Sequence, residues 1–100
     1  MDDFEKVKRI LDNIDEKNIE FTLHFYENLF SDRPQIENLI KNNLHRTDKL
    51  LNVKRQDANN PNEEKFRLEI RLSSRYSLIV VIVLSDDKLY IITAWNRLKK

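Results

Sequence analysis

The sequence predicts an α+β domain in which three N-terminal helices pack on one face of a three- to four-stranded antiparallel β-meander. The N-terminal half carries apolar residues at three- and four-residue spacings, the period of an amphipathic helix. The C-terminal half carries alternating or continuous apolar runs separated by short polar turns, which is typical of antiparallel strands. The 100 residues suffice for a single core, so we assign residues 1–100 to one domain.

The first helix is expected from about residue 2 to residue 14. Its apolar stripe consists of Phe4, Val7, Ile10, Leu11 and Ile14. Asp2 and Asp3 stand at its start, where acidic groups suit the positive end of the helix dipole.

The second helix is expected to begin near Thr22, whose hydroxyl can cap the free amides of the first turn, and to end near Ser31. The side chains expected to face the core are Phe21, Phe25, Leu29 and Phe30.

The third helix has a start signal in Asp32 as N-cap, Pro34 in the first turn and Gln35 in a capping box. Its apolar stripe is Ile36, Leu39, Ile40 and Leu44. His45 and Arg46 follow it and are expected to act as C-terminal caps, because cations suit the negative end of the dipole.

The strands are expected after this helical half. A short first strand is possible at Leu50–Arg55, with Leu51 and Val53 inward, and residues 57–62 form a loop. Residues 65–72 alternate strictly, with Phe66, Leu68, Ile70 and Leu72 on one face and Lys65, Arg67, Glu69 and Arg71 on the other. Residues 78–84 have no polar face, so that strand is expected to be central and covered on both sides, or to meet a partner. Residues 88–95 form the last strand.

Composition excludes several classes of protein. The chain has no cysteine and only two histidines, so we expect no metal site and no cofactor. The longest apolar run, Leu78–Leu84, is far shorter than the roughly 20 residues that span a bilayer, and the acidic N-terminus is unlike a signal peptide. We therefore expect a cytoplasmic protein with no membrane contact. The net charge of +1 gives no sign of nucleic-acid binding, so only the distribution of charge along the chain can indicate such binding.

The predicted sheet resembles that of the RelE/ParE toxin superfamily, and is closest to BrnT-like toxins and related uncharacterised small domains. The similarity is carried by Lys65-Phe-Arg-Leu-Glu-Ile-Arg71, by Arg75-Tyr76 at a strand start and by Tyr90-Ile-Ile-Thr-Ala-Trp-Asn-Arg97. Upstream, His24 and Arg33 resemble a His-Ala-x-x-Arg motif and its following arginine. Asn28 stands where the first arginine is expected, and Phe25 replaces the small residue. The resemblance covers roughly residues 20–97.

The resemblance implies an mRNA endoribonuclease of a toxin–antitoxin pair that acts by metal-independent phosphodiester cleavage. When a 2′-hydroxyl attacks the adjacent phosphate, the site must move protons and hold the negative charge that builds on the phosphoryl oxygens. The candidate catalytic residues are His24, Glu27 and Tyr76, and His24 and Glu27 share one face of a helix. The candidate phosphate-binding residues are Arg67, Arg71, Arg75 and Arg97.

Two alternatives stay open at the level of sequence: a non-catalytic protein-interaction module with a toxin-like fold, and a nucleic-acid-binding protein without chemistry. His24 also fits a structural histidine, and Glu69 between Arg67 and Arg71 also fits ordinary ion pairs. The expected partners are an antitoxin protein, RNA or a second copy of the chain. Strand addition is expected at a sheet edge near Trp95, which also fits a packing or interface residue.

Overall fold

The computed structural model describes residues 2–28 and 33–98. The elements follow in the order α1 (Asp3–Asn13), η1 (Glu16–Asn18), β1 (Ile19–Phe21), α2 (Leu23–Asn28), α3 (Arg33–Asn43), η2 (Thr47–Lys49), β2 (Leu50–Gln56), β3 (Glu64–Arg71), β4 (Tyr76–Ser85) and β5 (Lys88–Leu98). The α+β class is therefore confirmed.

The sheet is larger than the sequence predicts, and it is mixed. Its strand order is β1-β5-β4-β3-β2, with β1 parallel to β5 and the other neighbours antiparallel. The four antiparallel strands β2 to β5 form the expected meander. The parallel strand β1 was not expected, because its 3 residues are too few to show alternation. Since β1 precedes α2, the three helices do not all precede the sheet.

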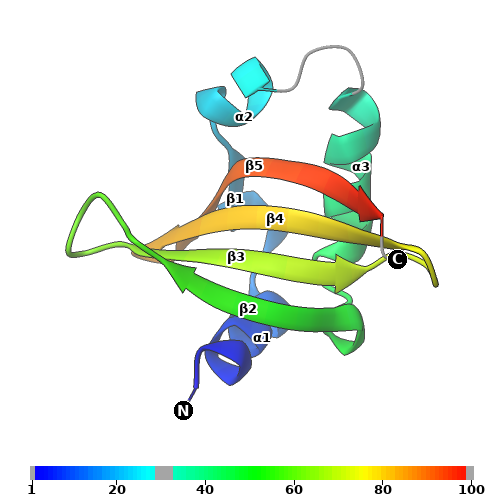
Figure 1. Ribbon diagram of the computed structural model, residues 1–100. Coiled ribbons are helices and arrows are strands. Elements are labelled where there is room, and N and C mark those ends of the chain that lie inside the picture. Colours follow the sequence, from blue (N-terminus) through cyan, green and yellow to red (C-terminus); the bar gives the residue numbers. More distant parts are fainter. Residues whose placement is uncertain (1, 29–32, 99–100) are drawn as a thin grey trace.

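The three helices leave one face of the sheet uncovered. In Figure 1 no helix crosses the sheet face turned to the viewer, and α3 lies behind β4 and β5. The core lies between the helices and the hidden face, where α1 and α3 residues pack on Phe66, Leu68, Val80 and Ile82. The expectation that residues 78–84 form the central strand is confirmed, because β4 is the third of the five strands. Cover on both sides is not found, since no described helix lies over its second face.

The start of α2 is tied to the sheet by Thr22. Its hydroxyl accepts from the backbone N–H of Phe25 at 3.2 Å, as expected of a cap, and donates to the Ile91 carbonyl at 3.0 Å. Phe21 was expected on this helix but belongs to β1. The expectations for Leu29, Phe30, Ser31 and Asp32 lie outside the described residues.

The structure differs from the sequence prediction at β2 and at the end of α3. In β2, Leu50 is buried and Leu51 is 36% exposed, because a bulge between Leu50 and Asn52 shifts the alternation. His45 does not cap its own helix, since its Nδ1 lies 2.9 Å from the carbonyl oxygen of Leu11 and joins the end of α3 to α1. The stripe of Ile36, Ile40 and Leu44 is buried as predicted.

No helix in the described ranges is long and apolar enough to cross a membrane.

Candidate functional site

The uncovered side of the sheet, called the open face below, consists of every second residue on each strand. It carries Asn52, Lys54 and Gln56 of β2, Lys65, Arg67, Glu69 and Arg71 of β3, Ser77, Ile79, Val81 and Val83 of β4, and Thr93, Trp95 and Arg97 of β5. The pairing arranges them in rows across the strands. One row contains Lys54, Arg67, Val81 and Thr93, the next contains Asn52, Glu69, Ile79 and Trp95, and the third contains Arg71, Ser77 and Arg97.

Arg67 and Trp95 meet across the central strand. The guanidinium carbon of Arg67 lies 5.3 Å from the centroid of the Trp95 ring, close enough for a cation–π interaction. Beneath them, Ile79 is 1% exposed and Val81 is 9% exposed, although neither belongs to the main core cluster. The two long side chains therefore cover apolar surface on a face that no described helix shields.

A cavity of about 160 Å³ lies beside Arg67 on the open face. Its lining residues are Asn52, Lys54, Arg67, Leu68, Glu69, Ile79 and Arg97. Sequence reasoning singled out Arg67 and Arg97, and the fold brings them together at this cavity. It missed Asn52 and Lys54, because only the pairing of β2 with β3 shows which β2 residues lie beside Arg67 and Glu69.

The third row places a buried hydroxyl between two arginines. Ser77 pairs with Arg71 on one side and with Arg97 on the other. The Ser77 side chain is fully buried, and its Oγ has no hydrogen-bond partner. Both arginines are exposed, so they extend from this row toward solvent.

The other predicted residues lie elsewhere. Arg75 is exposed in the β3–β4 turn. Tyr76 alternates with Ser77, so its side chain leaves the sheet on the side opposite to Arg67, and it is 47% exposed. His24 and Glu27 are exposed on α2, which packs against β5, and neither lines the cavity beside Arg67.

Several cations outside this cavity are already paired. Arg55 bonds to Asp3 at 2.8 Å and to Glu64 at 3.0 Å, and its side chain stacks on Phe66. Lys88 pairs with Glu20 at 3.1 Å, and that hydrogen bond raises the pKa of Lys88. The ion pairs of the described residues do not include Arg67, Arg71 or Arg97.

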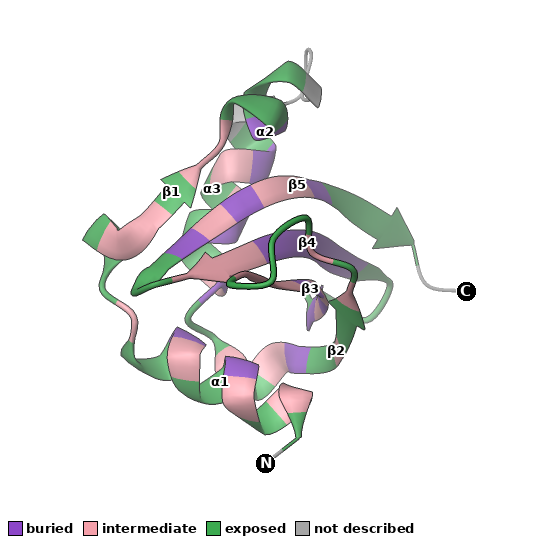
Figure 2. Ribbon diagram, turned by 90° about the vertical axis from the view of Figure 1, so that its left-hand side faces the viewer, coloured by how far each residue is buried: buried purple, intermediate pink, exposed green. Residues whose placement is uncertain are grey.

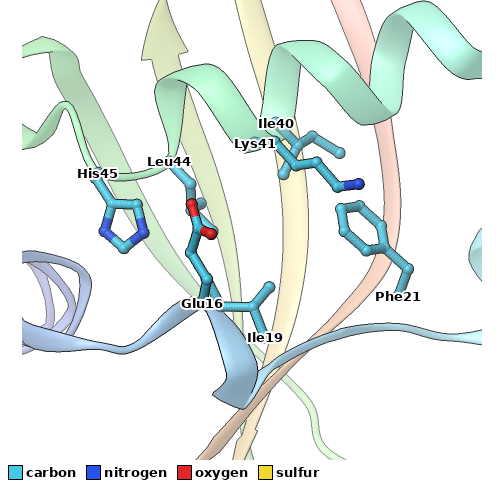
Figure 3. Close-up of a pocket in the computed structure, with 7 residues that line it drawn as sticks. All are labelled: Glu16, Ile19, Phe21, Ile40, Lys41, Leu44 and His45. Atoms are coloured by element: carbon cyan, nitrogen blue, oxygen red, sulfur yellow. The ribbon is translucent and has the colours of Figure 1, made fainter.

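A second cavity, of about 330 Å³, lies between α3 and the η1–β1 segment (Figure 3). Its floor is made by Ile19, Phe21, Ile40 and Leu44, and its rim by Glu16, Lys41 and His45. The ammonium of Lys41 lies 5.7 Å from the Phe21 ring centroid and 3.2 Å from a carboxylate oxygen of Glu37. Sequence reasoning did not foresee this cavity, because its walls come from segments that only the fold brings together.

No cluster of three or more potential metal-ligating side chains occurs within residues 2–28 and 33–98. Comparisons with protein-family models, curated proteins and solved structures found no match to the chain. The function must therefore be argued from the geometry of the two cavities and of the open face.

Proposed function

We propose that the open face of the sheet binds single-stranded RNA. The contact between Arg67 and Trp95 is the observation that carries this proposal, because it holds a cation and an aromatic ring together at the surface. Proteins that bind single strands combine cations that follow the phosphates with aromatic rings on which bases stack. Trp95 is 40% exposed, which leaves part of its surface for a base.

The distribution of charge also favours a polyanion. The cations in the rows around Arg67 are Lys54, Lys65, Arg67, Arg71 and Arg97, and the carboxylate among them is Glu69. The whole chain has a net charge of only +1 because acidic groups elsewhere, on the helices and in the turns, balance these cations. The local excess of cations therefore supports phosphate binding at the open face, although the net charge of the whole chain gives no such support.

We further propose that the protein cleaves the bound RNA without a metal ion. This is the activity that the resemblance to RelE/ParE toxins implies. A group that takes a proton must lie within hydrogen-bond reach of the 2′-hydroxyl. The cavity beside Arg67 contains Glu69, whereas His24 and Glu27 lie on α2. We therefore assign the role of proton acceptor to Glu69, and that of holding phosphate to Arg67 and Arg97. As the 2′-oxygen attacks phosphorus, Glu69 takes its proton, the P–O5′ bond breaks and the leaving 5′-oxygen takes a proton from water.

Binding is tested by the fluorescence anisotropy of a labelled, unstructured RNA. We expect Arg67→Ala and Arg97→Ala each to weaken binding about tenfold, the effect of losing a charge-assisted hydrogen bond. Arg9→Ala is the matched control, because Arg9 is exposed on α1, away from the open face. Equal affinities for all three variants, with unchanged thermal unfolding, would overturn the proposal.

Cleavage is tested by gel analysis of the same RNA after incubation without metal. If Glu69 accepts the proton, Glu69→Gln retains binding and yields no products, while the wild type yields fragments with a 2′,3′-cyclic phosphate. Intact RNA with the wild type overturns the cleavage proposal and leaves the binding proposal standing.

A partner-binding role, as in a toxin–antitoxin pair or a homodimer, is favoured by the outer edge of β5. The described pairing of β1 covers only Leu89–Ile91, whereas β5 continues to Leu98. Near this end Tyr76 and Leu98 are 47% and 58% exposed, and Figure 2 shows the exposed end of β5. Backbone groups and apolar side chains together suit an added strand. A monomeric mass by sedimentation at high concentration, with no strand-adding peptide recovered from a peptide library, would count against this role.

A further inference from the structure

We propose that the cavity between α3 and the η1–β1 segment binds a guanine base, at a site separate from the RNA-binding face. Figure 3 shows Glu16 and His45 on one side of this cavity and Lys41 on the other, above an apolar floor. The volume of about 330 Å³ lies at the lower end of the range of small-molecule sites. A flat base fits a cavity whose floor is made of Ile19, Phe21, Ile40 and Leu44.

One side of the cavity presents hydrogen-bond acceptors. The Nδ1 of His45 lies 2.9 Å from the Leu11 carbonyl oxygen, and a carbonyl only accepts, so Nδ1 carries the proton. In the neutral ring Nε2 is therefore an acceptor, and Figure 3 shows the ring edge away from α1 turned toward Glu16. The Glu16 carboxylate adds further acceptors, and the ion pairs of the described residues do not include it.

The opposite side presents a donor that already pairs with a carboxylate. Lys41 pairs with Glu37 at 3.2 Å, four positions earlier on the same helix. An ammonium has three N–H groups, so Lys41 can still donate to a ligand. Because Glu37 offsets its charge, this donor suits a neutral carbonyl oxygen better than a phosphate.

Guanine matches both sides of the cavity. Its N1–H and N2–H₂ groups form one donor edge, which pairs with the Glu16 carboxylate and the Nε2 of His45. Its O6 and N7 acceptors lie on another edge, within reach of a donor such as Lys41. Adenine lacks the adjacent N–H donors at positions 1 and 2, so the site should discriminate against it. The base can belong to a free guanosine compound or to an RNA strand, and the recognition chemistry is the same in both cases.

Titration with guanosine, inosine and adenosine, followed by NMR chemical shifts, tests the proposal. We expect guanosine to bind best, inosine about tenfold more weakly because it lacks the 2-amino group, and adenosine most weakly. The perturbed signals should be those of Ile19, Phe21, Ile40 and Leu44. Equal affinity for all three nucleosides, or no perturbation at these residues, would overturn the proposal.

Three variants and a second ligand sharpen this test. Glu16→Gln should weaken guanosine binding about tenfold, whereas Glu5→Gln, a matched change at an exposed position of α1, should leave it unchanged. If free guanosine and a guanine-containing trinucleotide shift the same cavity signals, the site accepts both sources, and a shift with only one of them identifies the source. Arg67→Ala should not affect guanosine binding, so failure of the RNA-binding proposal is distinguishable from failure of this one.

Discussion

Arg67 on β3 and Trp95 on β5 are in contact although β4 lies between their strands. The distance from guanidinium to ring is 5.3 Å, while two neighbouring strand spacings separate the backbones by roughly 10 Å. Both side chains therefore lean over β4, where they cover Ile79 and Val81. The pair thus stabilises the open face while keeping a cation and an aromatic ring at its surface.

Trp95 should report RNA binding directly, because it is the only tryptophan in the chain. If a base stacks near its ring, the intrinsic fluorescence should be quenched as unstructured RNA is added. The quenching should follow the same binding curve as the anisotropy of a labelled RNA. Anisotropy that rises while the Trp95 emission stays constant would place the RNA elsewhere.

The salt dependence of RNA affinity should report the number of phosphates that the protein contacts. For a single strand, the slope of log K against log salt is about −0.7 for each phosphate neutralised. We expect Arg97→Ala to reduce the magnitude of this slope by about 0.7, whereas Arg9→Ala should not change it. An unchanged slope in Arg97→Ala would exclude a phosphate contact at that side chain.

Replacing Ser77 should stabilise the protein. Its buried Oγ has no hydrogen-bond partner, so the folded state bears the cost of removing a hydroxyl from water. We expect Ser77→Ala to raise the free energy of unfolding by about 1 kcal/mol in urea titrations. Thr93→Ala, on the neighbouring strand of the open face, is the control, and a loss of stability in Ser77→Ala would show that the hydroxyl is satisfied in solution.

Acid should weaken the contact between α1 and the edge of the sheet. Hydrogen bonds from Lys6 and then Arg55 lower the pKa of Glu64 below its ordinary 4.5, and the Arg55 hydrogen bond lowers that of Asp3. Because both pKa values are lowered by folding, this stabilisation is complete above about pH 4.5 and is lost as the pH falls through the folded values.

Glu64→Gln tests this linkage. At pH 7 we expect a loss of up to about 1 kcal/mol, since these ion pairs are partly exposed, and the difference from the wild type should shrink near pH 3. Urea unfolding at both pH values measures the change, with the exposed Glu5→Gln as control. A difference that grows on acidification would contradict the assignment.

The local sequence was enough to predict the elements that carry a clear period. The stripe of Ile36, Ile40 and Leu44 and the alternation of Phe66, Leu68 and Ile70 were predicted because each is a pattern of neighbours along the chain. The central position of β4 was predicted because its residues 78–84 have no polar face, although no described helix covers the second face of this strand. The amphipathic character of α1 and the Thr22 cap were predicted for the same reason, since both depend on residues that are neighbours along the chain.

Features that depend on pairing between distant segments arise only when the chain folds. The strand β1 is stabilised by pairing with β5, and its 3 residues carry no period of their own. The register between β2 and β3 places Lys54 in the row of Arg67, and α3 meets β1 to form the second cavity. Which residues prefer water and which prefer the core can be read from the chain alone, since this preference follows from side-chain chemistry and local period. Only folding decided which cations, rings and carboxylates face each other, because their separation in space depends on strand order and register.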